Sequence, residues 1–178
     1  MRLERAREIA ELAMQELAPW CERIEIAGSI RRRKAEVGDV ELVCIPKQVR
    51  ALDLFEGSRE ERHPSFVKTV EEWRRVKGWP RGRYTQRMLP EGIALDLFMA
   101  RPQNWGLIFA VRTGSAAFSH SVLAMGWCRK GWESCEGMLW NQRSGGPATA
   151  ERRPIEVREE KELFELIGVD WVEPEQRG

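Results

Sequence analysis

The stretch from Gly28 to Glu41 constrains the fold of this chain more than any other. It begins with a Gly-Ser pair after an apolar run, continues with four consecutive basic residues, and ends with Gly38-Asp39-Val40-Glu41. Residues 39–45 have the composition of a buried strand. Because side chains two apart on a strand point the same way, Asp39 and Glu41 place two carboxylates on one face. The stretch therefore predicts an acidic strand beside a small, basic turn.

This acidic pair has two interpretations. Neighbouring carboxylates repel each other unless a proton or cation lies between them, and Mg²⁺ prefers oxygen ligands of this kind. The basic turn favours a nucleoside triphosphate held beside its metal ions. In the alternative, Asp39 and Glu41 lie on a solvated strand face and residues 31–34 form a charged loop. The Gly-Ser turn at this spacing favours the functional interpretation.

The composition is that of a globular protein with one sizeable core or two small ones. The chain has 178 residues, of which 42% are hydrophobic and 32% charged. No apolar run approaches the roughly 20 residues of a membrane helix, and the charged N-terminus lacks the apolar segment of a secretory signal. We therefore expect a cytoplasmic protein with no membrane partner.

The net charge is only +1, but the basic residues are unevenly distributed. No acidic residue occurs between positions 74 and 87, whereas six basic ones do: Arg74, Arg75, Lys77, Arg81, Arg83 and Arg87. A local basic surface can bind phosphates even when the total charge is near zero. Charge alone is equally compatible with a DNA-binding surface and with a solvated basic face.

Periodicity and turn residues predict the elements of the first part of the chain. We expect a helix over 2–18, strands over 22–27 and 39–45, a polar loop over 46–63, a helix from 66 that Gly78 and Pro80 close, and a hairpin over 82–99 with its turn at 89–92. In the return strand of this hairpin, Asp96 lies on the face opposite to Leu95 and Leu97. A carboxylate there is costly to bury unless it is paired or bound to a metal. Asp96 is thus a candidate third ligand, or alternatively an exposed residue of a half-solvated sheet.

The character of the sequence changes near Pro102, which we take as a seam between subdomains. Beyond it we expect a helix over 105–111, a tight Thr113-Gly114-Ser115 turn, a helix over 115–125, short strands over 127–131, 138–142 and 155–157, a loop over 144–147, and a helix over 159–167 that Gly168 ends.

Taken together, these motifs resemble those of family X DNA polymerases, the polymerase beta-like members of the nucleotidyltransferase superfamily. The matching residues occur in order along nearly the whole chain: Gly28-Ser29, Arg32, Gly38-Asp39-Val40-Glu41, Asp96, Thr113-Gly114-Ser115 with Phe118, and the C-terminal runs 160–168 and 173–177. Gly-Ser with the acidic pair would indicate only the superfamily, whereas the Thr-Gly-Ser turn and the tail are typical of family X.

The resemblance implies an α+β fold. It would comprise a polymerase beta-like palm with a mixed sheet and flanking helices over 1–102, and a small α+β nucleotide-binding subdomain over 103–178. The implied activity is that of a DNA-directed DNA polymerase that adds dNTPs to a primer 3′-OH, as in short-gap filling during repair. Its partners would be dNTP and DNA, as primer-template or gapped duplex, bound by a monomer.

The resemblance also assigns roles to residues. Asp39, Glu41 and Asp96 would be the catalytic ligands of two Mg²⁺ ions, which Mn²⁺ could replace. The nucleotide would contact Gly28, Ser29, Arg32, Gly38, Thr113, Gly114, Ser115, Phe118 and Ser119. Among these, Ser29 and Arg32 would bind the β- and γ-phosphates, the Thr-Gly-Ser turn would lie against the sugar, and Ser119 would lie near the base.

The chain departs from the family pattern at a few positions. Glu41 replaces the usual Asp, Ala94 replaces an Arg, Val111-Arg112 replaces an aromatic pair, and Ser119 replaces an amide side chain. Template dependence therefore stays open. The alternatives are a template-independent nucleotidyltransferase acting on DNA or RNA ends or another hydroxyl acceptor, and a non-catalytic module that binds DNA ends. The presence of all three carboxylates argues against the last.

Overall fold

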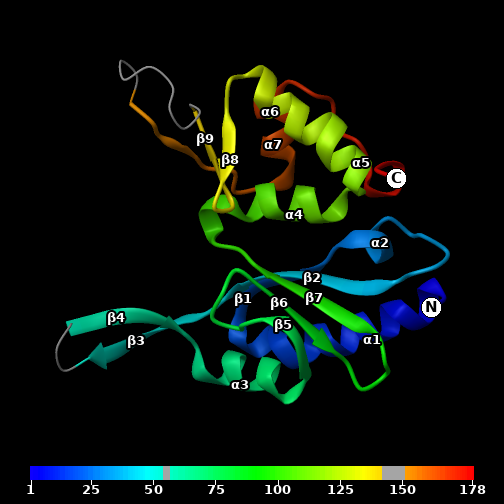
Figure 1. Ribbon diagram of the computed structural model, residues 1–178, viewed down its shortest axis with the longest axis vertical. Helices are drawn as coiled ribbons and strands as arrows, with labels where there is room; N and C mark the ends of the chain where they lie inside the picture. Colours follow the sequence, from blue (N-terminus) through cyan, green and yellow to red (C-terminus); the bar gives the residue numbers. More distant parts are fainter. Residues whose placement is uncertain (54–56, 142–150) are drawn as a thin grey trace. The chain divides into compact units, whose positions relative to one another are not determined.

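The computed structural model describes residues 1–53, 57–141 and 151–178, and its architecture is α+β (Figure 1). The chain forms two compact units, one of Met1–Ile30 with Lys34–Met99 and the other of Arg31–Arg33 with Ala100–Gly178. The predicted boundary at Pro102 placed residues 31–33 in the first subdomain, whereas their contacts group them with the second unit. Within the described residues, no helix is both long and apolar enough to cross a membrane.

The first unit is built on a mixed five-stranded sheet in the order β1–β2–β7–β6–β5. Its strands are β1 (Cys21–Ile26), β2 (Asp39–Pro46), β5 (Arg74–Gly78), β6 (Tyr84–Met88) and β7 (Ala94–Met99). The central strands β2 and β7 run parallel, and the other neighbours pair antiparallel. The predicted hairpin is confirmed, since β6 and β7 pair across the turn that follows Met88.

Helices α1 (Leu3–Leu17) and α3 (Pro64–Glu72) pack on one face of this sheet (Figure 1). The buried stripe of α1, which includes Ile9 and Leu17, meets Phe66 of α3 and the core-facing Leu42 and Leu97 of the two central strands. Burying one such side chain contributes roughly 1.5–3 kcal/mol. Because strand side chains alternate, the functional side chains of β2 and β7 belong to the other face.

Two predictions for the first unit are wrong. The expected polar loop over 46–63 contains an antiparallel hairpin of β3 (Gln48–Asp53) and β4 (Gly57–Arg62), whose cross-strand backbone hydrogen bonds need no hydrophobic pattern. Helix α3 ends at Glu72 instead of near Gly78. Trp73 is extended and buried, and the residues after it pair with β6 as strand β5.

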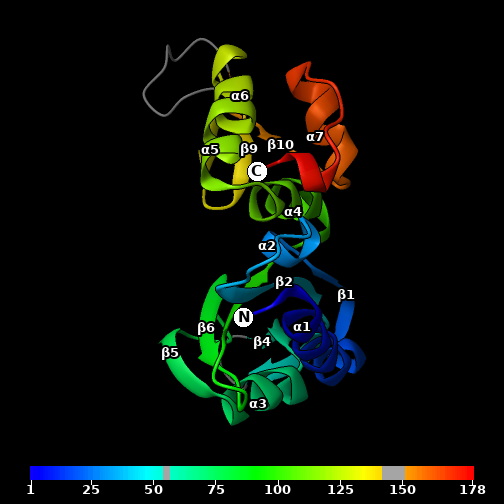
Figure 2. The same ribbon diagram turned by 90° about the vertical axis from the view of Figure 1, so that its right-hand side faces the viewer.

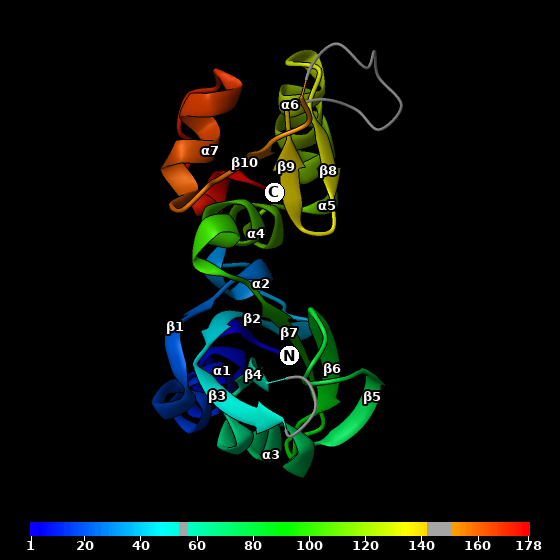
Figure 3. The same cartoon turned by 90° about the vertical axis from the view of Figure 1, so that its left-hand side faces the viewer.

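The second unit combines short helices with a three-stranded sheet (Figures 2 and 3). Its elements are α4 (Trp105–Thr113), α5 (Ala116–Phe118), a π-helical turn (Ser119–Ala124), α6 (Met125–Arg129), β8 (Glu133–Cys135), β9 (Met138–Trp140), β10 (Pro154–Ile155) and α7 (Glu160–Ile167). Gly126 allows α6 to approach α7, because a Cβ there would lie 2.8 Å from Ile167 Cδ1. Leu123, Leu139 and Leu163 form the centre of its core.

The helices of this unit agree with prediction better than the strands. Gly168 ends α7 in the left-handed conformation, with φ of 70°, as expected of a C-terminal glycine. The strand predicted over 127–131 is wrong, because Trp127 is buried within α6 and the helix continues to Arg129. Strand β8 was not predicted. The loop predicted over 144–147 lies outside the described residues.

Candidate active site

Three carboxylates share one face of the sheet of the first unit. Asp39 and Glu41 lie two residues apart on β2, and the parallel register pairs Glu41 directly with Asp96 of β7. All three are half-buried, whereas the alternating residues Val40 and Leu95 are fully buried on the other face. The backbone therefore brings the three predicted residues to adjacent positions on one side of the sheet.

Strand β6 supplies two neutral donors that hold the Asp96 carboxylate. The Tyr84 hydroxyl and Gln86 Nε2 each donate to Asp96 Oδ1 at 2.8 Å. Gln86 lies opposite Asp96 in the ladder, and Tyr84 lies two residues earlier on the same face. These two residues were not predicted as part of the site, although the hairpin turn places residue 86 opposite 96. They orient the carboxylate without neutralising it.

Gly28 is required where the chain passes Glu41. Its φ is +61°, and a Cβ at this position would lie 1.7 Å from Glu41 Oε2, so a side chain would displace the carboxylate. The next residue, Ser29, has a buried hydroxyl with no hydrogen-bond partner among the described residues. A buried hydroxyl without a partner is costly, so Ser29 retains a group that a ligand can satisfy. At Gly38, by contrast, an added Cβ would meet no atom within 4 Å.

The donor set on this face suits a hard divalent cation, although the side chains do not form a closed cage. All three candidate ligands are carboxylates, and oxygen is the donor that Mg²⁺ and Mn²⁺ prefer. Across residues 1–53, 57–141 and 151–178, no three His, Cys, Asp or Glu side chains gather closely enough to hold an ion. The residues fit a metal by chemistry and by backbone position.

In the second unit, two arginines hold the Thr113-Gly114-Ser115 turn. Arg31 Nη1 donates to Thr113 Oγ1 at 2.5 Å, and Arg32 Nη1 donates to the Thr113 carbonyl at 2.6 Å. Arg32 Nε is buried and has no partner within the described part of the chain, so this predicted phosphate ligand keeps a donor. The structure therefore brings Arg32 and the Thr-Gly-Ser turn together.

The remaining predicted nucleotide residues pack around the same turn. Ser115 Oγ accepts from Phe118 N at 3.1 Å and so caps the helix that follows. Ser119 Oγ donates to the carbonyl of Val111 at 2.9 Å. A Cβ on Gly114 would lie 2.7 Å from Ser119 Oγ and 2.8 Å from Phe118 Cδ1, so glycine permits this close packing.

Arg31, which donates to Thr113 of the turn, is also part of a buried ion network. Glu160 accepts from Nη1 and Nη2 of Arg31, at 2.8 and 2.7 Å, and from Arg177 Nη1 at 2.5 Å. Arg177 is fully buried. Burial lowers the pKa of its guanidinium, and the Glu160 carboxylate acts in the opposite direction. The network was not predicted from sequence, because nothing local distinguishes these residues from exposed ones.

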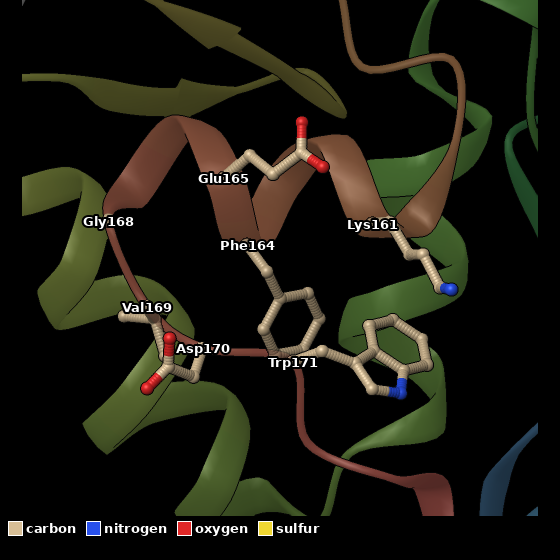
Figure 4. Close-up of a pocket in the computed structure, with 7 residues that line it drawn as sticks. All are labelled: Lys161, Phe164, Glu165, Gly168, Val169, Asp170 and Trp171. Carbon is tan, nitrogen blue, oxygen red and sulfur yellow. The ribbon is translucent and has the colours of Figure 1, made fainter.

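A hollow of about 410 Å³ lies beside α7 and contains none of the predicted site residues (Figure 4). Phe164 and Trp171 form its aromatic part, with ring centroids 5.1 Å apart. The Arg177 guanidinium stacks on both rings, at 4.9 Å from Phe164 and 4.5 Å from Trp171. The aromatic lining therefore belongs to the packing that buries Arg177.

The predicted basic surface is exposed except at one residue. Arg74, Arg75 and Lys77 on β5, and Arg81 and Arg83 after it, are all exposed. The assignment of Arg87 to this surface is wrong, because it is only 2% exposed on the core-facing side of β6. Its guanidinium donates to Thr85 Oγ1 and the Trp73 carbonyl, and burial lowers its pKa.

Two comparisons with known proteins found similarity to DNA polymerase beta. Residues 109–178 match the family model described as DNA polymerase beta thumb. Among solved structures, the chain is similar to Leishmania infantum polymerase beta in a ternary P/T complex, with a TM-score of 0.69 and 19% identity over 100% of this chain and 76% of that one. No curated protein sequence matches the chain. Residues 109–178 therefore resemble the DNA polymerase beta thumb, and the chain as a whole has a fold similar to that of the Leishmania infantum polymerase beta.

Proposed function

We propose that this chain is a DNA-directed DNA polymerase that transfers a nucleotide from a dNTP to a primer 3′-OH. The observation that carries the proposal is the register of β2 and β7, which aligns Glu41 with Asp96 and leaves Asp39 on the same sheet face. The fold of a family X polymerase supports it. The ternary P/T complex of the Leishmania infantum enzyme favours primer-template DNA as the partner.

Asp39, Glu41 and Asp96 would hold the divalent ions. Bound metal would supply Lewis acidity at the attacking hydroxyl and at the leaving pyrophosphate. The chain's own residues would supply position and charge. Ser29 would donate its hydroxyl hydrogen to the triphosphate, and Arg32 would donate its Nε–H, which has no partner among the described residues. Tyr84 and Gln86 would keep the Asp96 carboxylate in one orientation.

In the second unit, the Thr113-Gly114-Ser115 turn would bind the sugar, with Phe118 and Ser119 beside it. Gly28 would allow the backbone to pass close to Glu41, and Gly38 would leave open space before Asp39. The exposed cations of the basic segment would bind DNA phosphates: Arg74, Arg75, Lys77, Arg81 and Arg83.

Primer extension with Mg²⁺ tests this proposal on a one-nucleotide gapped duplex, an open primer-template and a single strand. We expect incorporation of the templated nucleotide, and a loss of more than about 100-fold in Asp96→Asn, because losing a metal ligand should cost more than losing a residue that supports one. Glu11→Gln is the matched control, since it neutralises an exposed carboxylate on α1.

Three outcomes contradict the proposal in different ways. Untemplated extension of the single strand would support a terminal nucleotidyltransferase. DNA binding without incorporation on any substrate would support a binding module. Full activity of Asp96→Asn would rule out the three-carboxylate site.

A further inference from the structure

An exposed tryptophan lies within the basic segment of the first unit. Trp79 directly follows β5, and 63% of its surface is exposed. A single exposed apolar side chain is common on protein surfaces, so the significance of Trp79 depends on its neighbours. The stretch 74–83 around Trp79 carries no acidic residue and five cations: Arg74, Arg75, Lys77, Arg81 and Arg83.

The exposure of Trp79 follows from how its turn is anchored. Gly82 N donates to the Trp79 carbonyl at 2.9 Å, which closes a four-residue turn with Pro80 at its second position. Pro80 is buried, and Arg62 Nη1 donates to the carbonyls of Pro80 and Gly82. Because Arg62 and the burial of Pro80 anchor the turn on the protein, the indole of Trp79 projects toward solvent.

Arg75 and the indole form a stacked pair. The Arg75 guanidinium carbon lies 3.8 Å from the centroid of the Trp79 ring, so the cation covers one face. Because most of Trp79 stays exposed despite this contact, its other face is open. The pair therefore presents an aromatic surface next to a guanidinium that can bind phosphate.

The properties of β5 indicate a polyanionic ligand and argue against pairing with a strand of another protein. β5 lies at the sheet edge and all five of its residues are exposed. Val76 is an extra residue between the paired Arg75 and Lys77, so the ladder is interrupted there. Edge strands that are basic and bulged resist pairing with another strand. Glu61, 3.4 Å from Arg81, neutralises only part of this surface.

We propose that Trp79, with Arg75 and Lys77, binds single-stranded DNA by stacking an unpaired base on the open face of the indole. Aromatic platforms among cations bind single strands in this way with little sequence preference, because every base has a π face. This inference deepens the proposed function and rests on it, since it makes unpaired nucleotides part of the DNA substrate.

The test is fluorescence anisotropy with a labelled oligo-dT, measured in EDTA without dNTP on the full chain. Trp79→Ala is expected to weaken binding about 5- to 140-fold, from the roughly 1–3 kcal/mol of one stacked base at about 1.4 kcal/mol per tenfold. Trp79→Phe, which keeps a π face, should retain most of the affinity. On an abasic strand of equal length, wild type and Trp79→Ala should bind equally.

Leu12→Ala is the matched control, because Leu12 is a 51% exposed apolar residue of α1 outside the basic segment, and its removal should leave dT binding unchanged. Arg75→Gln, which keeps the indole, is a second variant with a smaller expected loss. Equal dT binding by wild type and Trp79→Ala would overturn the inference, as would an equal loss on the abasic strand. The anisotropy assay needs no metal or nucleotide. Binding of oligo-dT that depends on Trp79, together with no incorporation in primer extension, would therefore refute the proposed function and leave this inference standing.

Discussion

The carboxylates of Glu160 and Asp96 are held in opposite ways by the two units. Glu160 accepts from the guanidinium groups of Arg31 and Arg177, so its charge is compensated inside the second unit. Asp96 of the first unit accepts from the neutral Tyr84 and Gln86. A charge compensated by arginines stabilises the fold, whereas a charge oriented by neutral donors stays available to a cation. From this contrast we infer a structural role for Glu160, and we propose a ligand-binding role for Asp96.

The largest expected effect is the difference in the free energy of unfolding between Glu160→Gln and Asp96→Asn. Glu160→Gln should lower the free energy of unfolding by about 3–5 kcal/mol, because it leaves buried Arg177 without its anion. Asp96→Asn should cost less than about 1 kcal/mol, because an amide oxygen still accepts from Tyr84 and Gln86. Urea denaturation of the full-length variants measures both.

The matched control for this pair is Glu165→Gln, which changes an exposed carboxylate on the same helix as Glu160. Its unfolding free energy should lie within about 0.5 kcal/mol of wild type. Equal losses from Glu160→Gln and Asp96→Asn would remove the distinction between the two units.

A smaller effect is expected where the backbone passes the acidic face. Gly28→Ala should lower the unfolding free energy by more than about 1 kcal/mol, because its φ is positive and its Cβ would overlap Glu41 Oε2. Primer extension should fall as well, since the Glu41 carboxylate must move. In Gly38→Ala the new Cβ meets no atom within 4 Å, so thermal unfolding should change little. Similar melting temperatures for the two variants would contradict this account.

The smallest effect tests whether the neutral donors position Asp96. Tyr84→Phe keeps the ring that stacks on Phe98 at 5.0 Å and removes only the hydroxyl. We expect a loss of about 0.5–1.5 kcal/mol in stability. The Mg²⁺ concentration for half-maximal incorporation should rise about 10- to 100-fold. An unchanged Mg²⁺ dependence would show that Tyr84 has only a structural role.

Local patterns predicted much of the sheet and of the candidate site. The strand signals of β2 and of the β6–β7 hairpin placed Asp39 and Glu41 on one face of their strand and Asp96 opposite Leu95 and Leu97. Only the parallel pairing of β2 with β7 brings the three to the same face of the sheet. Where the local signal was weak, prediction failed. In the hairpin of β3 and β4, the apolar alternation of β3 stops after Ala51 and β4 has no apolar side chain. Trp127 suited a helix as well as a strand.

What the sequence determined by itself is therefore the set of elements with strong periodicity or turn chemistry, and the motif residues that they carry. The tertiary structure alone decided which charges are buried. Arg87 points into the core although its basic neighbours are exposed, and Arg31 meets Glu160 across 129 positions of sequence. The physical reason is range: strand and helix periodicity act over a few residues, whereas the burial of a charge depends on partners that only the folded chain brings together.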